Sequence, residues 1–236
     1  MRPYIYWMCF MLGLSLTATA QSGPPDSDPV LQGSASYSMP QQAIDAEIDG
    51  KVVMGIHLDE SGTPTKAWLA SGPAWPCGST PMKAIEELSL SLTAAMMKLR
   101  FTPPVKGGKP VSRDIGLTLT LKNPYLGKKM PAPEIDPKTG KPKPRLVVGG
   151  VINGKATSLP APAYPSAAKA NRDHGGVTVE VLIDEQGNVI RAGALQGPAT
   201  LQFASRDAAC GAKFSPTRLS GNPVKVSGVI VYNFNL

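Results

Sequence analysis

The second half of the chain repeats the first half, and this repeat constrains the fold more than any other feature of the sequence. Between residues 40 and 73, a constant spacing of 125 residues pairs identical glycines and prolines. These pairs are Pro40 with Pro165, Gly50 with Gly175, Gly62 with Gly187, and Gly72-Pro73 with Gly197-Pro198. The spacing then becomes 113 residues, which pairs Phe101 with Phe214, so the first copy contains 12 extra residues. Because chance does not preserve turn residues over a whole domain, the spacing predicts two tandem copies of one structural unit.

Each copy begins with the pattern of a short helix followed by a β-hairpin. Pro40 and Pro165 suit the first turn of this helix, and Gly50 and Gly175 suit its left-handed C-terminal cap. Apolar and other residues then alternate as in a strand, and a turn with glycine leads into a second strand. The residues predicted to face the core are Val52, Met54, Ile56 and Leu58 in the first copy, and Val177, Val179, Val181 and Ile183 in the second.

A second helix and a final strand complete each copy. In the first copy, Thr80 suits the N-cap and Pro81 the first helical position of a helix that extends to Leu99. The residues predicted to face the sheet from the second helix of the second copy are Leu201, Ala204, Ala208 and Ala212. The final strands alternate, with Ile115, Leu117, Leu119 and Leu121 on one face in the first copy, and Ile230, Tyr232 and Phe234 in the second. The predicted fold class is α+β, with two tandem domains that each have a small antiparallel sheet and two helices on one face.

The same patterns predict the domain boundaries. Residues 1–20 are typical of a cleavable signal peptide, with Arg2, an apolar run and Ala18-Thr19-Ala20 as the cleavage site. We expect a disordered segment over residues 21–36, the first domain over 37–122, a Pro/Lys-rich linker over 123–149 and the second domain over 150–236. No later segment approaches the length of a transmembrane helix, so the sequence predicts an exported, periplasmic protein.

The basic residues are concentrated in the predicted linker. The chain has a formal net charge of +7, and residues 122–150 contain seven Lys or Arg against two Asp or Glu. Nucleic-acid-binding domains instead carry their basic residues on a folded face with stacking aromatic side chains. The charge pattern therefore argues against nucleic acid as a partner, although it is compatible with a weak contact to an anionic cell wall.

The titratable residues predict neither an enzyme nor a metal site. The chain has two histidines, of which His57 is expected on the solvent-facing side of a strand and His174 in the last turn of a helix. The acidic pairs Asp59-Glu60 and Asp184-Glu185 fall at hairpin turns, where exposed carboxylates are poor catalysts. We therefore expect no catalytic residues, no metal ligands and no cofactor.

Two cysteines, Cys77 and Cys210, follow the predicted signal peptide and lie at non-equivalent positions in the two copies. A disulfide can persist in an oxidising compartment if the two Cα atoms come within about 4.4–6.8 Å. The sequence leaves three alternatives open: a bridge between the domains, a bond to another chain, or free thiols.

A set of short motifs in the second copy resembles the C-terminal domain of TonB. These motifs are Tyr164-Pro165, Gly176-Val177, Ile183-Asp184, Gly187-Asn188-Val189, Leu201, Phe214-Ser215-Pro216 and Gly221-Asn222-Pro223-Val224. The second copy departs from the family at Ala212, where a large aromatic residue is usual. The first copy resembles the family more loosely, and its insertion around Trp75-Pro76-Cys77-Gly78 has no counterpart in it.

The resemblance implies a protein-binding module. TonB-like domains pair an edge strand with a short segment of outer-membrane transporters, and an edge strand has unpaired N–H and C=O groups that suit such pairing. We expect this edge in the terminal strand from Val226 to Leu236, with Val229, Val231 and Asn233 facing away from the core. The predicted function is a periplasmic adaptor for a protein partner in the cell envelope.

Two other functions stay open from the sequence. One is a membrane-anchored TonB energy transducer that keeps its N-terminal helix uncleaved in the inner membrane. The other is a structural envelope protein that its basic linker holds to the cell wall. The sequence also leaves open a homodimer formed by strand exchange.

Overall fold

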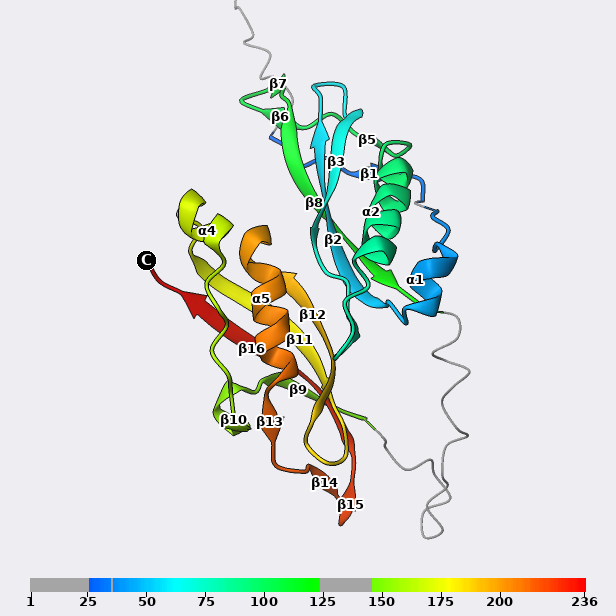
Figure 1. Ribbon diagram of the computed structural model, residues 1–236. Helices are drawn as coiled ribbons and strands as arrows, with labels where there is room; N and C mark the ends of the chain where they lie inside the picture. The colour runs from blue at the N-terminus through cyan, green and yellow to red at the C-terminus, as the bar shows by residue number, and fades with distance from the viewer. Residues whose placement is uncertain (1–25, 35, 124–145) are drawn as a thin grey trace, which may run out of the picture.

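The computed structural model describes residues 26–34, 36–123 and 146–236. The predicted signal peptide and most of the predicted linker lie outside these residues. The described part is of the predicted α+β class and forms two units, which we call the N-terminal unit (residues 26–123) and the C-terminal unit (residues 146–236). Figure 1 shows them as two neighbouring sheets, each with helices packed on it.

The N-terminal unit is built on a three-stranded antiparallel sheet with the order β3-β2-β8. Its main elements are α1 (Gln41–Asp45), β2 (Gly50–Leu58), β3 (Pro64–Ser71), α2 (Met82–Met96) and β8 (Arg113–Leu121). Short strands form two further pairs, β1 (Leu31–Gln32) with β5 (Arg100–Phe101), and β6 (Val105–Lys106) with β7 (Lys109–Pro110). Strand β1 lies inside the segment 21–36 that we predicted to be disordered, so that prediction is wrong for these residues.

The C-terminal unit is built on a five-stranded sheet with the order β4-β12-β11-β16-β9. Its main elements are β9 (Leu146–Val151), α4 (Ser166–Asn171), β11 (Gly175–Ile183), β12 (Val189–Gln196), α5 (Ala199–Cys210) and β16 (Lys225–Phe234). Shorter elements are η1 (Asn153–Lys155), β10 (Ala156–Ser158), β13 (Lys213–Phe214), β14 (Arg218–Leu219) and β15 (Asn222–Pro223). Strand β4 (Trp75–Pro76) belongs to the insertion of the first copy, and it joins this sheet from the N-terminal unit.

The two units have the same order of main elements and the same strand register. Strand β2 pairs with β8 from Gly50 opposite Leu121 to Leu58 opposite Arg113, and β11 pairs with β16 at the equivalent positions. The Phe101 N–H donates to the Gly62 carbonyl (3.2 Å), and the Phe214 N–H donates to the Gly187 carbonyl (2.8 Å). This likeness is compatible with a tandem duplication, which stays a hypothesis.

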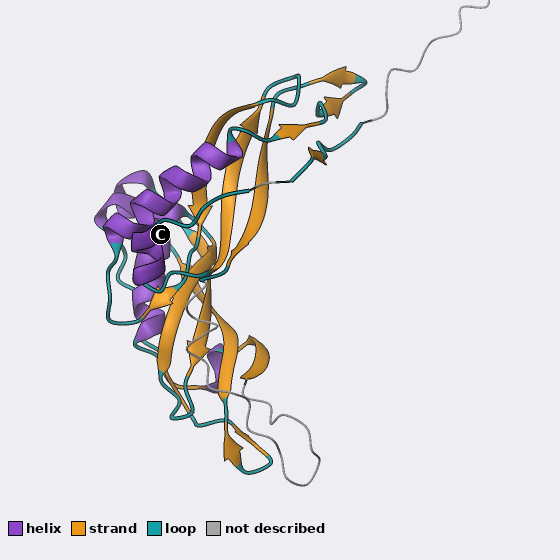
Figure 2. Ribbon diagram, turned by 90° about the vertical axis from the view of Figure 1, so that its right-hand side faces the viewer, coloured by secondary structure: helices purple, strands orange, loops and turns teal. Residues whose placement is uncertain are grey.

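The predicted core faces of the hairpin strands are confirmed. Each of the eight residues predicted to point inward from β2 and β11 is at most 3% exposed. Helix α2 packs on β2 and β3, and α5 packs on β11 and β12. In Figure 2 both helices lie on the same side of the strands.

The ends of the helices differ from the prediction. The left-handed residues after α1 and α4 are Glu47 (φ 55°) and Arg172 (φ 56°), whereas Gly50 and Gly175 begin the next strands. Helix α2 begins at Met82 with Pro81 as its N-cap residue, and Thr80 lies before it. His174 lies after α4 rather than in its last turn. The short helices therefore end earlier than the glycines suggest, because other residues adopt the left-handed conformation there.

The buried face of α5 also differs from the predicted one. Its buried residues are Leu201, Ser205, Arg206 and Ala209, whereas Ala204 and Ala208 are half-buried. Arginine is seldom buried unless its guanidinium has partners, so a helical apolar pattern does not predict Arg206 as a core residue. Two of its hydrogen-bond acceptors come from the N-terminal unit, as described below.

The C-terminal sheet is mixed, so the prediction of an antiparallel sheet is wrong for this unit. Strand β9 runs parallel to β16, whereas the other pairs in the sheet are antiparallel. It begins at Leu146, within the predicted linker of residues 123–149 and before the predicted domain boundary at residue 150. The apolar residues 146–148 thus belong to the sheet, although their sequence neighbourhood is rich in proline and lysine.

The buried hydroxyl of Tyr232 on β16 allows a test of the packing of the C-terminal core. Its side chain is 6% exposed, and its hydroxyl has no hydrogen-bond partner among the described residues. Burial raises the pKa of Tyr232 to about 12. We expect Tyr232→Phe to leave the free energy of unfolding at neutral pH unchanged or to raise it by up to about 1 kcal/mol, because it removes an unsatisfied buried hydroxyl.

The pH dependence of unfolding provides the second readout for Tyr232. A raised pKa of the folded state stabilises the protein below the unfolded pKa of about 10, and this stability decreases as the pH rises towards 12. Chemical denaturation at neutral and at alkaline pH should therefore show a smaller alkaline loss for Tyr232→Phe than for the wild type. A large loss for the variant at neutral pH would instead mean that the hydroxyl is hydrogen-bonded in solution.

Candidate functional site

The outer edge of β16, where we predicted a partner to bind, is occupied by the chain itself. Strand β9 pairs with β16 from Leu146 opposite Lys225 to Val151 opposite Val229. The prediction of β16 as an edge strand is therefore wrong, because the preceding segment of the chain already satisfies its outward backbone groups. Val229 and Val231 are half-buried, and Asn233 is exposed.

Two residues after β9 fasten the chain to β16. The Ile152 N–H donates to the Val229 carbonyl (2.9 Å). The Asn153 side chain serves both backbone groups of Val231: its Nδ2 donates to the carbonyl (2.7 Å) and its Oδ1 accepts from the N–H (2.9 Å). A Cβ at Gly228 would lie 2.7 Å from Ile152 Cδ1, so the glycine permits the close approach of the isoleucine. The backbone groups of Val229 and Val231 that face outward are thus already used.

Strand β9 is itself the edge of the five-stranded sheet. Its exposed side chains are Leu146 (49% exposed), Val148 (80%) and Val151 (66%). Residues 146–152 contain no charged side chain. Among the described residues no strand pairs with the outer side of β9. This apolar, uncharged strand has none of the charged residues that usually protect a sheet edge from pairing with other chains.

The opposite edge of the same sheet is closed by the insertion of the first copy. Strand β4 pairs with β12, with Trp75 opposite Ala192 and Pro76 opposite Arg191. Next to this pair, Cys77 and Cys210 form a disulfide with a Cα–Cα distance of 5.6 Å. Of the three alternatives that the sequence left open, the structure thus has the bridge between the two units.

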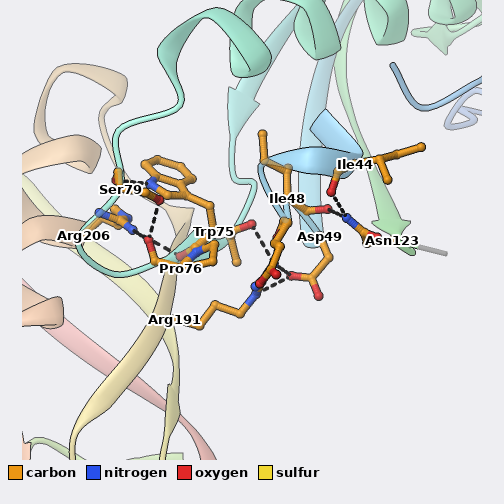
Figure 3. A network of polar contacts seen from close by, with 11 residues as sticks. Ile44, Ile48, Asp49, Trp75, Pro76, Ser79, Asn123, Arg191 and Arg206 are labelled. Atoms are coloured by element: carbon orange, nitrogen blue, oxygen red, sulfur yellow. Dashed lines mark hydrogen bonds and ion pairs between the residues drawn. The ribbon is translucent and has the colours of Figure 1, made fainter. Parts of the chain in front are cut away.

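Arg206 forms the centre of the junction between the units (Figure 3). Its side chain is 2% exposed, and its Nη2 donates to the carbonyls of Pro76 (2.8 Å) and Trp75 (3.2 Å). Its guanidinium carbon lies 4.1 Å from the centre of the Trp75 ring, a cation–π distance. Burial lowers the pKa of Arg206, while Asp207 opposes this shift. The insertion thus supplies two carbonyl acceptors for Arg206, whereas its Nη1 donates to Asp207 (3.0 Å) and its Nε has no hydrogen-bond partner among the described residues.

Arg191 makes a second set of contacts across the junction (Figure 3). Its Nε donates to Asp49 Oδ1 (2.7 Å), and its Nη2 donates to the Glu47 carbonyl. Burial raises the pKa of Asp49, while the charge and hydrogen bond of Arg191 act in the opposite direction. Both arginines come from the C-terminal unit and bind acceptors in the N-terminal unit. The junction therefore combines a covalent bond, strand pairing and two buried or half-buried cations.

Strand β8 lies at an edge of the N-terminal sheet, whereas its counterpart in the C-terminal sheet, β16, is covered by β9. Strand β8 is equivalent to β16, and among the described residues it pairs only with β2. Ile115, Leu117 and Leu119 on its core-facing side are half-buried, whereas Ile230 and Tyr232 at the equivalent positions of Leu117 and Leu119 are 0% and 6% exposed. Among the described residues, β9 and β8 thus each pair with a strand on one side only, as does β3 at the other edge of the N-terminal sheet.

The histidines do not form a catalytic centre with one another. His57 Nδ1 lies 2.6 Å from Asp114 Oδ1, and both side chains are exposed. His174 Nδ1 lies 2.9 Å from the Arg172 carbonyl. The described part of the chain contains no group of three or more His, Cys, Asp or Glu residues placed to share a metal ion. These contacts are those of surface side chains.

The aspartates of the two acidic pairs, Asp59 and Asp184, stabilise hairpin turns. Asp59 accepts hydrogen bonds from the N–H groups of Ser61 and Thr63 and from the Ser61 hydroxyl, and these bonds lower its pKa. Asp184 is equivalent, since burial acts to raise its pKa but the bonds from Asn188 and Gln186 lower it. Both carboxylates therefore act as acceptors for the turn backbone, which is the structural role expected at a hairpin tip.

No helix within residues 26–34, 36–123 and 146–236 combines the length and the apolar character needed to cross a bilayer.

The comparisons with known proteins concern the C-terminal unit. Residues 160–236 match the family model for the Gram-negative bacterial TonB protein C-terminal domain. Among solved structures, the chain is similar to the solution NMR structure of the Pseudomonas aeruginosa TonB C-terminal domain. The identity is 22%, the match covers 37% of this chain and 93% of that one, and the TM-score is 0.31. A search of curated proteins found no match. Over residues 160–236 the chain is therefore similar to the TonB C-terminal domain family.

Proposed function

We propose that this protein is a TonB-like binding module of the Gram-negative cell envelope that pairs one of its sheet edges with a partner protein. The family match of residues 160–236 supports a role in protein interaction. The observation that carries the proposal is the open edge of the C-terminal sheet at β9, which is apolar and uncharged. The role is one of binding and involves no catalysis and no cofactor.

The partner contributes an extended segment that adds a strand next to β9. Its main-chain groups pair with the outward N–H and C=O groups of β9, and its side chains cover Leu146 and Val148. In this arrangement β16 does not touch the partner, because β9 lies between them. Val229 and Val231 instead hold Ile152 and Asn153, and so keep β9 in place. The partner class is an envelope protein such as an outer-membrane transporter.

The periplasm is the proposed location. The predicted signal peptide over residues 1–20 supports export, and a TonB-like domain supports the envelope. Fractionation of cells with N-terminal sequencing of the protein tests this location. A periplasmic product that begins at Gln21 would support the adaptor. An intact Met1 in the inner membrane would contradict it and support the anchored energy transducer.

Val148→Lys is expected to weaken binding of the envelope partner at least about tenfold, because a lysine on an edge strand opposes pairing with another strand. Val148 is 80% exposed, so the substitution leaves the core intact. Leu90→Lys is the matched control, since Leu90 is 65% exposed but lies on α2, away from the edge. Quantitative pull-down from envelope extract measures both variants against the wild type.

A photoreactive amino acid at position 148 identifies the partner directly. We expect it to cross-link an envelope protein, whereas the same amino acid at position 90 should not. Equal cross-linking from both positions, or equal loss of binding in both lysine variants, would contradict a site at β9.

A further inference from the structure

Strand β8 lies at an edge of the N-terminal sheet, outside residues 160–236, which match the TonB family model. In the C-terminal unit the equivalent edge carries β9. Among the described residues, no strand pairs with the outer side of β8.

One hydrogen bond in the neighbouring strand β2 indicates which backbone groups of β8 point outward. Thr65 Oγ1 donates to the His57 carbonyl (3.3 Å), which places the backbone groups of His57 on the β3 side of β2. Because these groups alternate along a strand, Ile56 faces β8, and so does Met54. Their partners Ile115 and Leu117 therefore face β2. Hence the N–H and C=O groups of residues 114, 116, 118 and 120 point away from the sheet.

The C-terminal unit confirms this alternation at the equivalent strand. Val229 and Val231 correspond to Gly116 and Thr118 at the spacing of 113 residues. Their outward groups bind Ile152 and Asn153, as described above. In β8 the same groups have no strand partner among the described residues.

The side chains of β8 form one apolar row and one small polar row. Ile115, Leu117 and Leu119 lie in a half-buried row on the helix-covered face. Gly116, Thr118 and Thr120 lie exposed on the other face. An added strand would remove the apolar row further from solvent. The equivalent residues of β16, which has a strand on each side, are buried.

We propose that β8 pairs with β8 of a second copy of this chain, antiparallel and about a two-fold axis at Leu117. Leu117 then lies opposite Leu117 of the second copy, and Ile115 lies opposite the second copy's Leu119. Gly116 and the second copy's Thr118 exchange both hydrogen bonds, because the backbone groups of both residues point outward. The two three-stranded sheets become one sheet of six strands, and the interface is closed by its symmetry.

The pattern of β8 favours its own copy as the occupant. The apolar row is symmetric about Leu117, so aliphatic side chains meet aliphatic ones along the whole pairing. No like charges lie opposite one another: Asp114 meets Thr120 of the second copy, and it lies diagonal to the second copy's exposed Lys122. At the ends of β8, Arg113 is paired with Asp28 and Leu121 is buried, so the pairing is confined to residues 114–120.

Two double variants at the same positions test the register. A Cβ at Gly116 would touch only Val53 Cγ1 at 3.7 Å, and Thr118 is exposed, so both positions accept a longer side chain. In G116K/T118K, lysine lies opposite lysine across the interface. In G116K/T118E, lysine lies opposite glutamate. Like charges directly opposite one another destabilise a strand pair, whereas opposite charges stabilise it.

The experiment is analytical ultracentrifugation of the mature full-length chain from micromolar to millimolar concentration. We expect the wild type to form a dimer, G116K/T118K to dissociate at least about tenfold more readily, and G116K/T118E to associate as well as the wild type or better. Circular dichroism verifies that both variants are folded, and Leu90→Lys serves as the control for an unrelated surface charge.

Three outcomes would overturn the proposal. One is a wild type that stays monomeric at millimolar concentration. Another is a dimer that responds equally to both double variants, which would place the contact in another register or elsewhere. The third is a monomer whose β8 cross-links to a different envelope protein, which would make that protein the occupant. None of these outcomes affects the proposed partner site at β9, because Val148 lies in the other unit.

Discussion

Replacing both Cys77 and Cys210 with alanine is expected to lower the free energy of unfolding by about 4 kcal/mol. The disulfide joins residues 133 positions apart and closes a long loop that contains parts of both units. Without it, the unfolded chain gains conformational freedom, and β4 is held on β12 only by its backbone pairing and the contacts of Arg206 and Arg191. Chemical denaturation followed by tryptophan fluorescence measures the effect, because Trp75 lies at the junction.

The reduced wild-type protein is the matched control for this variant. Reduction breaks the bond without removing the two side chains, which contact the C-terminal core. We expect the reduced protein and the alanine variant to unfold at similar denaturant concentrations. If reduction leaves the unfolding midpoint of the wild type unchanged, the noncovalent junction alone fixes the two units, and the role assigned to the disulfide is wrong.

Gly187→Ala is expected to destabilise the C-terminal unit by about 3 kcal/mol or more. Gly187 has a φ of +89°, and a Cβ there would lie 1.9 Å from the Phe214 carbonyl oxygen. The added methyl group must therefore displace backbone, in addition to the strain of a left-handed conformation. Gly62→Ala should have a comparable effect on the N-terminal unit, since its Cβ would lie 2.3 Å from the Phe101 carbonyl oxygen. Thermal and chemical denaturation measure both variants.

Gly221→Ala separates the steric effect from the conformational one. Gly221 has a φ of +83°, similar to that of Gly187, but no atom lies within 4 Å of the position of its Cβ. It should cost only the strain of the left-handed conformation, about 1 kcal/mol. Equal losses for Gly187→Ala and Gly221→Ala would mean that the Phe214 backbone moves away easily, and that the close packing of the hairpin on this strand is not required.

The hairpins and their core faces were predictable because their signals are local. Alternation of side chains along a strand places Val52 and Val177 on the core face whatever the rest of the chain does, and both are buried. The turn residues Gly62 and Gly187 likewise reflect a positive φ that glycine adopts without penalty. These features recur in both copies, so each copy supported the interpretation of the other.

The candidate site was harder to predict, because it depends on which strands lie at the edges. Strand β9 follows a Pro/Lys-rich segment, and its six residues are too few for a strong periodic signal. The pairing of residues 146–148 with residues 225–227 joins positions far apart in the sequence. The sequence therefore predicts the terminal strand as the edge, whereas β9 covers it.

The junction was missed for a related reason. Trp75-Pro76-Cys77 stood out as an insertion without a counterpart, and Cys210 was the other cysteine after the predicted signal peptide. Together they could have favoured the bridge between the units. The buried Arg206, however, becomes understandable only when the carbonyls of Trp75 and Pro76 lie beside it.

By itself, the amino-acid sequence determined the repeated order of helices and strands, the faces that they bury and the resemblance of the second copy to the TonB family. Only the tertiary structure decided which edges are open, which are covered, and how the insertion joins the units. The physical reason is that burial depends on side chains, which differ from residue to residue, so it leaves a pattern in the sequence. Edge pairing uses backbone N–H and C=O groups that nearly every residue carries, so it leaves almost none.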